Sequence, residues 1–249
     1  MSNNGSVAGQ AGTSLSDFEE HDYSALWRGK RLEDLAQKHV IRSWLPQGES
    51  CLEVGGGYGR VTSLLESRFS HVAMLEFAKR NISMAKQRLR RARIMRADAA
   101  HIPIRSDSFD CAVMVRVVHL LPEPDVVIRE IYRVVRNGGT VIISVPNLQM
   151  NRLSWSLKER LMPKGLRNRA QTYGSAEWPY GERPYLLPNR YFVPASFEAR
   201  GKKGTGLFDN YVGKMLGRFR PLYLVDVATS PFWLFKFDIF MRFVVHKVA

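Results

Sequence analysis

Long apolar runs are missing from this chain of 249 residues, and so is a basic start followed by an apolar core. A membrane-spanning helix needs roughly 17 to 25 mostly apolar residues, and a secretory signal needs that basic-then-apolar start. We therefore expect no transmembrane segment and a cytoplasmic location. The hydrophobic content of 45% is enough for one sizeable core.

Cysteine is almost absent, because the chain has only Cys51 and Cys111. Both lie in short apolar segments that are typical of buried strands, and a disulfide is improbable in a reducing compartment. No cluster of His, Cys and acidic residues accompanies them with the spacing of metal ligands. We expect both cysteines to be packing residues, and no metal site.

Acidic residues are scarce, since the chain has 23 Asp and Glu against 37 Lys and Arg, which gives a net charge of +14. The excess is concentrated in residues 79–93 and after Gln149. A surface of this kind attracts polyanions, but no RNA-binding module signature is present. A nucleic acid partner is therefore not favoured, and a peripheral contact with an anionic membrane stays open.

Glycine is concentrated in residues 52–60, where the pattern predicts a strand that turns tightly into a helix. The segment reads Leu52-Glu53-Val54-Gly55-Gly56-Gly57-Tyr58-Gly59-Arg60. Glycine at 55, 57 and 59 lets the backbone bend and approach a ligand without a Cβ between them. A phosphate-binding P-loop needs Lys-Ser/Thr after the last glycine, and a dinucleotide fingerprint needs a small residue where Arg60 stands, so neither pattern fits.

Two more acids follow at the ends of later strands. Glu76 ends the apolar run 71–75, about 20 residues after Glu53, where an acid can accept hydrogen bonds from ribose hydroxyls. Asp98 follows the next segment of the chain. Either acid can instead cap a helix or be solvated in a loop.

The spacing Glu-x-Gly-x-Gly-x-Gly, together with Glu76 and Asp98, resembles the class I S-adenosylmethionine-dependent methyltransferases. The run 115–147 is similar to the quinone-biosynthesis C-methyltransferases within that family. The resemblance implies S-adenosyl-L-methionine as cofactor, Asp98 facing the adenine amino group, and a doubly wound α/β Rossmann-like sheet of seven strands with an antiparallel last strand. The implied cofactor-binding residues are Glu53, Gly55, Gly57, Gly59, Glu76, Phe77, Asp98, Ala99 and Arg116.

Segment 109–115 is apolar and β-branched, which predicts a buried central strand. Ligands of an open parallel sheet gather beyond the carboxyl ends of its strands, which places Arg116 and His119 near the reacting centre. A hydroxyl acceptor needs a base, and His119 is the candidate catalytic residue, although it can equally cap or pack. A helix is expected at 124–135, ended by residues 137–139, and a strand at 140–145.

Domain boundaries follow from composition. We expect a disordered leader at 1–16 and a single methyltransferase domain at 17–249, with 148–220 as an inserted substrate-recognition cap. Two terminal strands are expected, at 221–227 and 241–248. One or two helices at 17–45 are expected to cover the cofactor mouth. The candidate lid and substrate residues are Tyr23, Trp27, Arg28 and Tyr191.

Together these features predict an enzyme that transfers a methyl group to a small or medium organic acceptor by in-line displacement. A tRNA or rRNA methyltransferase is the alternative within the same chemistry. A regulatory protein that binds the cofactor without catalysis is the alternative of another class, and a dehydrogenase is a third.

Overall fold

The structure is a computed structural model that describes residues 19, 23–147, 150, 197–206, 222–232 and 235–247. The expected leader at 1–16 and the candidate Tyr191 lie outside these residues. No helix in the described part of the chain combines the length and apolar character that crossing a bilayer requires.

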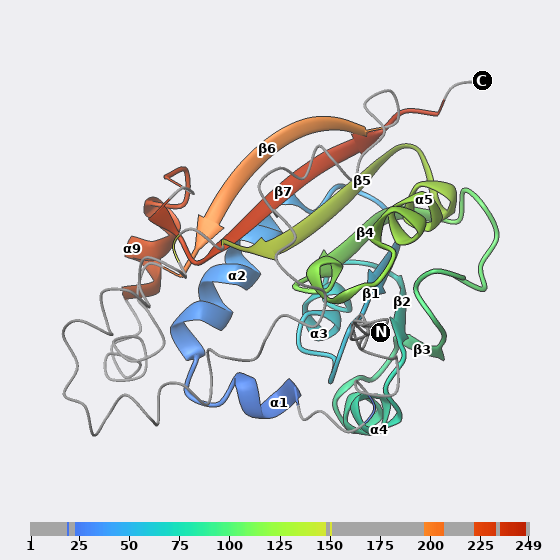
Figure 1. The fold of residues 1–249 in the computed structure, drawn as a ribbon, viewed down its shortest axis with the longest axis horizontal. Coiled ribbons are helices and arrows are strands. Elements are labelled where there is room, and N and C mark those ends of the chain that lie inside the picture. Colours follow the sequence, from blue (N-terminus) through green and yellow to red (C-terminus); the bar gives the residue numbers. More distant parts are fainter. Residues whose placement is uncertain are drawn as a thin grey trace, which may run out of the picture.

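One mixed sheet of seven strands forms the centre of the molecule, in the order β3-β2-β1-β4-β5-β7-β6 (Figure 1). Its strands are β1 (Ser50–Val54), β2 (His71–Glu76), β3 (Arg93–Arg96), β4 (Phe109–Val115), β5 (Val135–Pro146), β6 (Phe197–Thr205) and β7 (Asp238–Val245). Strands β1 to β5 pair in parallel, whereas β7 is antiparallel to β5 and to β6. The predicted seven-stranded sheet with a reversed last strand is confirmed.

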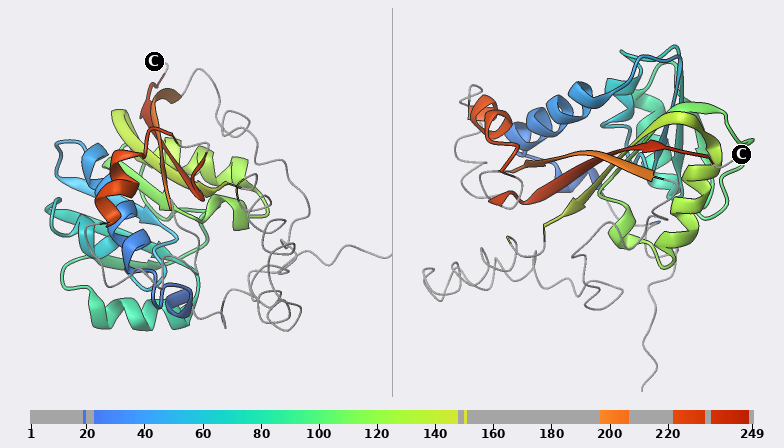
Figure 2. Two further views of the ribbon diagram at one scale, coloured as in Figure 1. Left: turned by 90° about the vertical axis from the view of Figure 1, so that its left-hand side faces the viewer. Right: turned by 90° about the horizontal axis from the view of Figure 1, so that it is seen from above.

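Helices cover both faces of the sheet (Figure 2). The helical elements are α1 (Tyr23–Leu26), α2 (Arg31–Trp44), α3 (Thr62–Leu65), α4 (Lys79–Arg88), the 3-10 turn η2 (Val118–Leu120), α5 (Pro124–Val134) and α9 (Leu222–Ala228). Buried residues of α5 pack against Leu52 and Val54 of β1, whereas those of α2 and α3 pack against Cys51. Neighbouring strand residues point to opposite faces, so these two apolar clusters lie on opposite faces of the sheet. With helices packed on both faces, the sheet is doubly wound.

The two cysteines occupy the middle of the sheet. Cys51 of β1 is the register partner of Cys111 of β4, and both side chains are fully buried with free thiols. Burial raises the pKa of the Cys51 thiol well above its ordinary value. The predicted role in packing, without a disulfide, is confirmed.

The C-terminal part departs from expectation. Residues 222–228 form a helix, so the predicted strand at 221–227 is wrong. Tyr223 lies beside His39 of α2, with ring centroids 6.4 Å apart, and Asp226 is buried, while Leu224 and Val225 are exposed. A short apolar run does not distinguish helix from strand, and here one face of the helix packs on α2.

The sixth strand is Phe197–Thr205 instead, inside the range expected for the cap. Its Glu, Arg, Lys and Gly residues hide the strand pattern, and charged side chains are typical of an edge strand, which β6 is. Residues 197–205 of the range 148–220 therefore belong to the sheet, and most of the remainder, to which the cap interpretation applies, lies outside the described residues. The helix expected at 124–135 ends at Val134, so residues 137–139 lie in β5 rather than at the helix end.

Candidate functional site

The glycine loop begins where β1 ends and turns into α3 at the carboxyl edge of the sheet. Gly55, Gly57 and Gly59 have positive φ angles of 70°, 56° and 80°, which side chains rarely tolerate. A Cβ at Gly55 would lie 2.4 Å from Val117, whereas a Cβ at Gly57 would meet nothing within 4 Å. Gly57 therefore faces open space at the edge where open α/β sheets bind ligands.

Glu76 is held at the same edge by the loop itself. Its Oε2 accepts the backbone N–H of Gly57 at 2.8 Å, and its Oε1 accepts that of Ala78 at 2.9 Å. Asn81 of α4 donates a third, longer hydrogen bond of 3.4 Å to Oε1. The carboxylate is thereby fixed in position, and Oε2, which accepts one hydrogen bond, retains a lone pair that can accept a hydrogen bond from a ligand hydroxyl.

Glu53 lies beneath the loop rather than at its rim. Its side chain is 3% exposed, and it accepts a hydrogen bond from the hydroxyl of Thr62, the first residue of α3. Burial raises the pKa of Glu53 to about 7, and the nearby charge of Glu76 adds to the rise. This contact makes Glu53 a support of the loop, and its direct role in binding a cofactor stays a prediction.

Asp98 lies two residues past β3, beside Glu76. Arg96 is the register partner of Glu76, and the N–H of Ala97 donates to the Glu76 carbonyl at 3.3 Å. The Asp98 carboxylate accepts the N–H of Ala100 at 2.9 Å, a turn that fixes its direction. The chain thus brings the last two predicted acids to neighbouring strand ends, and Ala99, next to Asp98, belongs to the buried apolar core.

Arg116 and His119 follow β4, as expected. Arg116 has a φ of 59°, a strained value for a residue that is not glycine, and its Nη1 contacts Glu33 of α2 at 3.3 Å and Asp238 of β7 at 3.4 Å. His119 is 4% exposed, and burial together with the charge of Arg116 lowers its pKa to about 3. Its imidazole is therefore neutral and a weak base.

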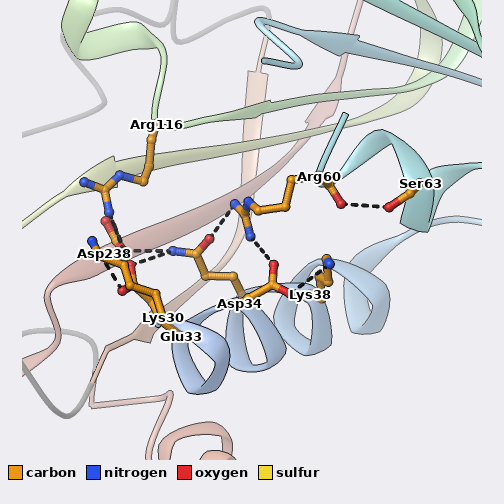
Figure 3. Close-up of polar contacts among 9 residues, drawn as sticks. Lys30, Glu33, Asp34, Lys38, Arg60, Ser63, Arg116 and Asp238 are labelled. Carbon is orange, nitrogen blue, oxygen red and sulfur yellow. Dashed lines mark hydrogen bonds and ion pairs between the residues drawn. The ribbon is translucent and has the colours of Figure 1, made fainter. Parts of the chain in front are cut away.

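Arg60 is the residue that sequence reasoning missed. It directly follows Gly59, and its side chain is buried against α2 (Figure 3). Nη1 donates to Asp34 at 2.7 Å, and Nη2 donates to the amide oxygen of Gln37 at 2.8 Å. The sequence signal was present, since Asp34 and Gln37 are three positions apart on a helix and so project from one face.

The network continues from Arg60 along α2 as far as Arg116 and Asp238 (Figure 3). Gln37 donates to Asp238 at 2.9 Å, and Asp238 in turn contacts Arg116. Helix α2 is thereby bound to the glycine loop, to the end of β4 and to the start of β7. Burial raises the pKa of Asp238 to about 6, against the opposing effect of Arg116.

Trp27 joins the same network from the segment that precedes α2. The guanidinium carbon of Arg60 lies 3.5 Å from the centre of the Trp27 ring, a close cation–π contact. Trp27 is half-buried and Arg28 is exposed, and the backbone of Tyr23 begins α1. The structure therefore places one candidate lid residue against the loop, while the lid function of all three stays a prediction.

Comparison with known proteins agrees with this geometry. A family described as a methyltransferase domain matches residues 52–143, which include the glycine loop, Glu76 and Asp98. This part of the chain is a domain of the class I S-adenosylmethionine-dependent methyltransferase type. The cofactor of this family is S-adenosylmethionine, and the open face of Gly57 beside the fixed Glu76 carboxylate fits a nucleoside of this kind.

Individual relatives are distant. A demethylmenaquinone methyltransferase of Clavibacter sepedonicus is 26% identical over 160 residues, which cover 62% of this chain and 65% of that protein. The matched region spans less than two thirds of the length of the first curated relatives. An S-adenosylmethionine-dependent methyltransferase of Thermotoga maritima shares the fold at 18% identity, with a TM-score of 0.63 over 89% of this chain and 93% of that one.

Replacing Gly57 by Ala tests whether the open face of the loop is a binding surface. We expect the strain of a positive φ to cost about 1 to 2 kcal/mol of stability, and the new methyl group to weaken S-adenosylhomocysteine binding measured by calorimetry. Gly55→Ala carries the same strain plus the clash with Val117, so it should destabilise the fold far more. Unchanged binding by folded Gly57→Ala would contradict the site.

Replacing Glu53 by Gln tests its raised pKa. The folded protein binds this proton more tightly than the unfolded chain, so the free energy of unfolding falls as pH rises from about 4.5 to about 7. A glutamine side chain stays neutral, so the variant should match the wild type near pH 4.5 and exceed its stability by up to about 3 kcal/mol at pH 8. Urea titrations at both values check this, and a difference independent of pH would refute it.

Arg60→Met should loosen α2 from the glycine loop, since it removes the ion pair with Asp34 and the contact with Trp27. We expect a loss of about 2 kcal/mol in unfolding free energy, together with weaker S-adenosylhomocysteine binding. Arg68→Met is the matched control, because its guanidinium bonds to Pro46 and Gln47, away from the loop. Equal effects of the two substitutions would show that Arg60 has no special role.

Proposed function

We propose that this methyltransferase transfers a methyl group to a small or medium organic acceptor. S-adenosylmethionine supplies an activated methyl group on a sulfonium, so the protein needs chiefly to align the acceptor and to exclude water. The observation that carries the proposal is the Glu76 carboxylate, fixed by the N–H of Gly57 beside open space. It supports hydrogen bonds to the ribose hydroxyls, which would orient the nucleoside along the loop.

The acceptor would approach from the end of β4 and the start of β7. In this region Arg116, Glu33 and Asp238 provide polar groups, and a third of the Arg116 side chain is exposed. The hydrogen bonds that join α2 to Arg60 and Asp238 lie beside these groups and limit their movement. These contacts favour in-line alignment of the acceptor with the methyl donor, because they limit how far the carboxyl edge of the sheet can open.

The small-molecule character of the acceptor is supported by the names of relatives alone. One curated relative is a demethylmenaquinone methyltransferase, and another is a 2-methyl-6-phytyl-1,4-hydroquinone methyltransferase of Oryza sativa, 31% identical over 99 residues. A tRNA or rRNA acceptor remains the alternative, because the net charge of +14 suits a polyanion.

A second candidate function is cofactor binding without methyl transfer. The [4+2]-cyclase SpnF has the same fold, with a TM-score of 0.55 and 19% identity over 88% of this chain and 82% of that one. The fold by itself therefore does not require methyl transfer. Detection of S-adenosylhomocysteine formation with a candidate acceptor would decide between the two.

The proposed general base, His119, is needed only if the acceptor is a hydroxyl. Its buried, neutral imidazole limits this role, because a group with a pKa of about 3 accepts a proton weakly at pH 7. A carbon or nitrogen acceptor needs less assistance. The structure therefore gives more support to acceptors that are nucleophilic without a base.

Glu76→Ala tests the cofactor assignment directly. Loss of charge-assisted hydrogen bonds to the ribose should weaken S-adenosylhomocysteine binding by about 1 to 3 kcal/mol in calorimetry. Wild-type protein should bind S-adenosylmethionine and S-adenosylhomocysteine but not NAD. Asp125→Ala is a control, because Asp125 is exposed in the first turn of α5 and away from the loop. Binding of NAD alone, or full affinity in Glu76→Ala, would overturn the proposal.

A further inference from the structure

Helix α4 and strand β3 carry a dense group of positive charges, which we call the basic band. It consists of Lys79, Arg80, Lys86, Arg88, Arg90, Arg91, Arg93 and Arg96, all of them exposed. No Asp or Glu occurs anywhere in residues 79–96. A solvated helix face normally mixes charges of both signs, so this segment needs another explanation.

Two carboxylates from outside the segment reach the basic band, and neither neutralises it. Glu19 forms an ion pair with Arg96 and accepts the backbone N–H of Lys79. Glu66 accepts three backbone N–H groups of residues 90–92, at 2.6 to 3.1 Å. The Glu66 carboxylate thus closes the turn between α4 and β3.

Within the described part of the chain, Lys86, Arg88, Arg90 and Arg93 form no ion pair with a carboxylate. The charges act on their own helix in opposite ways, because Lys79 and Arg80 stand in the first turn of α4 without an acid, whereas Lys86 and Arg88 stand in the last turn. Cations at a helix N-terminus oppose the macrodipole. Cations in the last turn favour the macrodipole, so it accounts for Lys86 and Arg88 but not for the charges in the first turn or at residues 90–96.

We propose that the basic band binds the surface of an anionic lipid bilayer. Each Lys or Arg near such a surface contributes about 1 kcal/mol of attraction, and the binding needs no shaped pocket. Lys79 lies three residues past Glu76, so the basic band begins beside the cofactor site. The bilayer would hold the carboxyl edge of the sheet close to the lipid surface. This inference concerns attachment and does not depend on the acceptor.

A lipid surface fits the basic band better than single-stranded nucleic acid does. Proteins that bind single strands stack bases on exposed aromatic rings. The two rings beside the basic band already have guanidinium groups over them, Arg88 at 5.4 Å from the centre of Tyr58 and Arg96 at 5.6 Å from that of Phe77. A bilayer requires only the positive charge.

The test is co-sedimentation of the full chain with vesicles of phosphatidylglycerol and phosphatidylcholine. The triple variant Lys86→Glu, Arg90→Glu and Arg93→Glu reverses three charges of the basic band that have no carboxylate partner in the described part of the chain. We expect vesicle affinity to fall by at least about ten-fold in this variant. Binding by the wild type should weaken steeply with added salt.

The matched control reverses three exposed charges outside the basic band, Arg105→Glu, Arg129→Glu and Lys202→Glu. Either set of substitutions lowers the net charge from +14 by 6 to +8, so a difference between the variants reports position rather than total charge. S-adenosylhomocysteine affinity should be unchanged in both variants, which verifies folding and separates this proposal from the proposed function.

Three results would overturn the proposal: equal loss of vesicle binding in the two variants, equal wild-type binding to vesicles of pure phosphatidylcholine, or no vesicle binding at all. Tight binding of total tRNA that depends on the same three residues, without vesicle binding, would assign the basic band to nucleic acid instead.

Discussion

The arrangement of the carboxyl edge depends on the contact between the buried guanidinium of Arg60 and helix α2. It joins the last glycine of the loop to Asp34 and Gln37 of α2, and through Gln37 the chain of contacts reaches Asp238 and the end of β4. Glycine gives the loop its shape but no rigidity, because it adds backbone freedom. The loop is rigid because a charged side chain is fixed on the neighbouring helix, where several hydrogen bonds satisfy it.

Glu53 and Glu76 contribute to the glycine loop in different ways. Glu76 is fixed at the carboxyl edge of the sheet by the backbone N–H groups of Gly57 and Ala78. Glu53 is buried one strand away, with a raised pKa and a hydroxyl partner. One carboxylate is therefore available to a ligand, whereas the other maintains the junction of β1 and α3. The same residue type serves binding and support because the two carboxylates have different partners, backbone N–H groups for Glu76 and the Thr62 hydroxyl for Glu53.

Much of the fold could be predicted from the sequence where the pattern is local. The apolar runs before Gly55 and Arg116 predicted buried strands, and the spacing of Glu76 and Asp98 predicted neighbouring strand ends. The sixth strand could not be found in this way, because Phe197–Thr205 pairs with β7 at an exposed edge and carries charges. The helix at 222–228 was missed because its pattern is set by contacts with α2. Arg60 was missed because its partners lie 23 and 26 positions earlier.

The thiols of Cys51 and Cys111 lie opposite each other on the two central strands, fully buried, and burial raises the pKa of Cys51 well above its ordinary value. Helices α2 and α3 cover these thiols, so a thiol reagent reaches them only when the helices leave the sheet or the sheet itself opens. The rate of alkylation therefore reports how often the core between the sheet and these two helices opens, rather than small movements of the glycine loop.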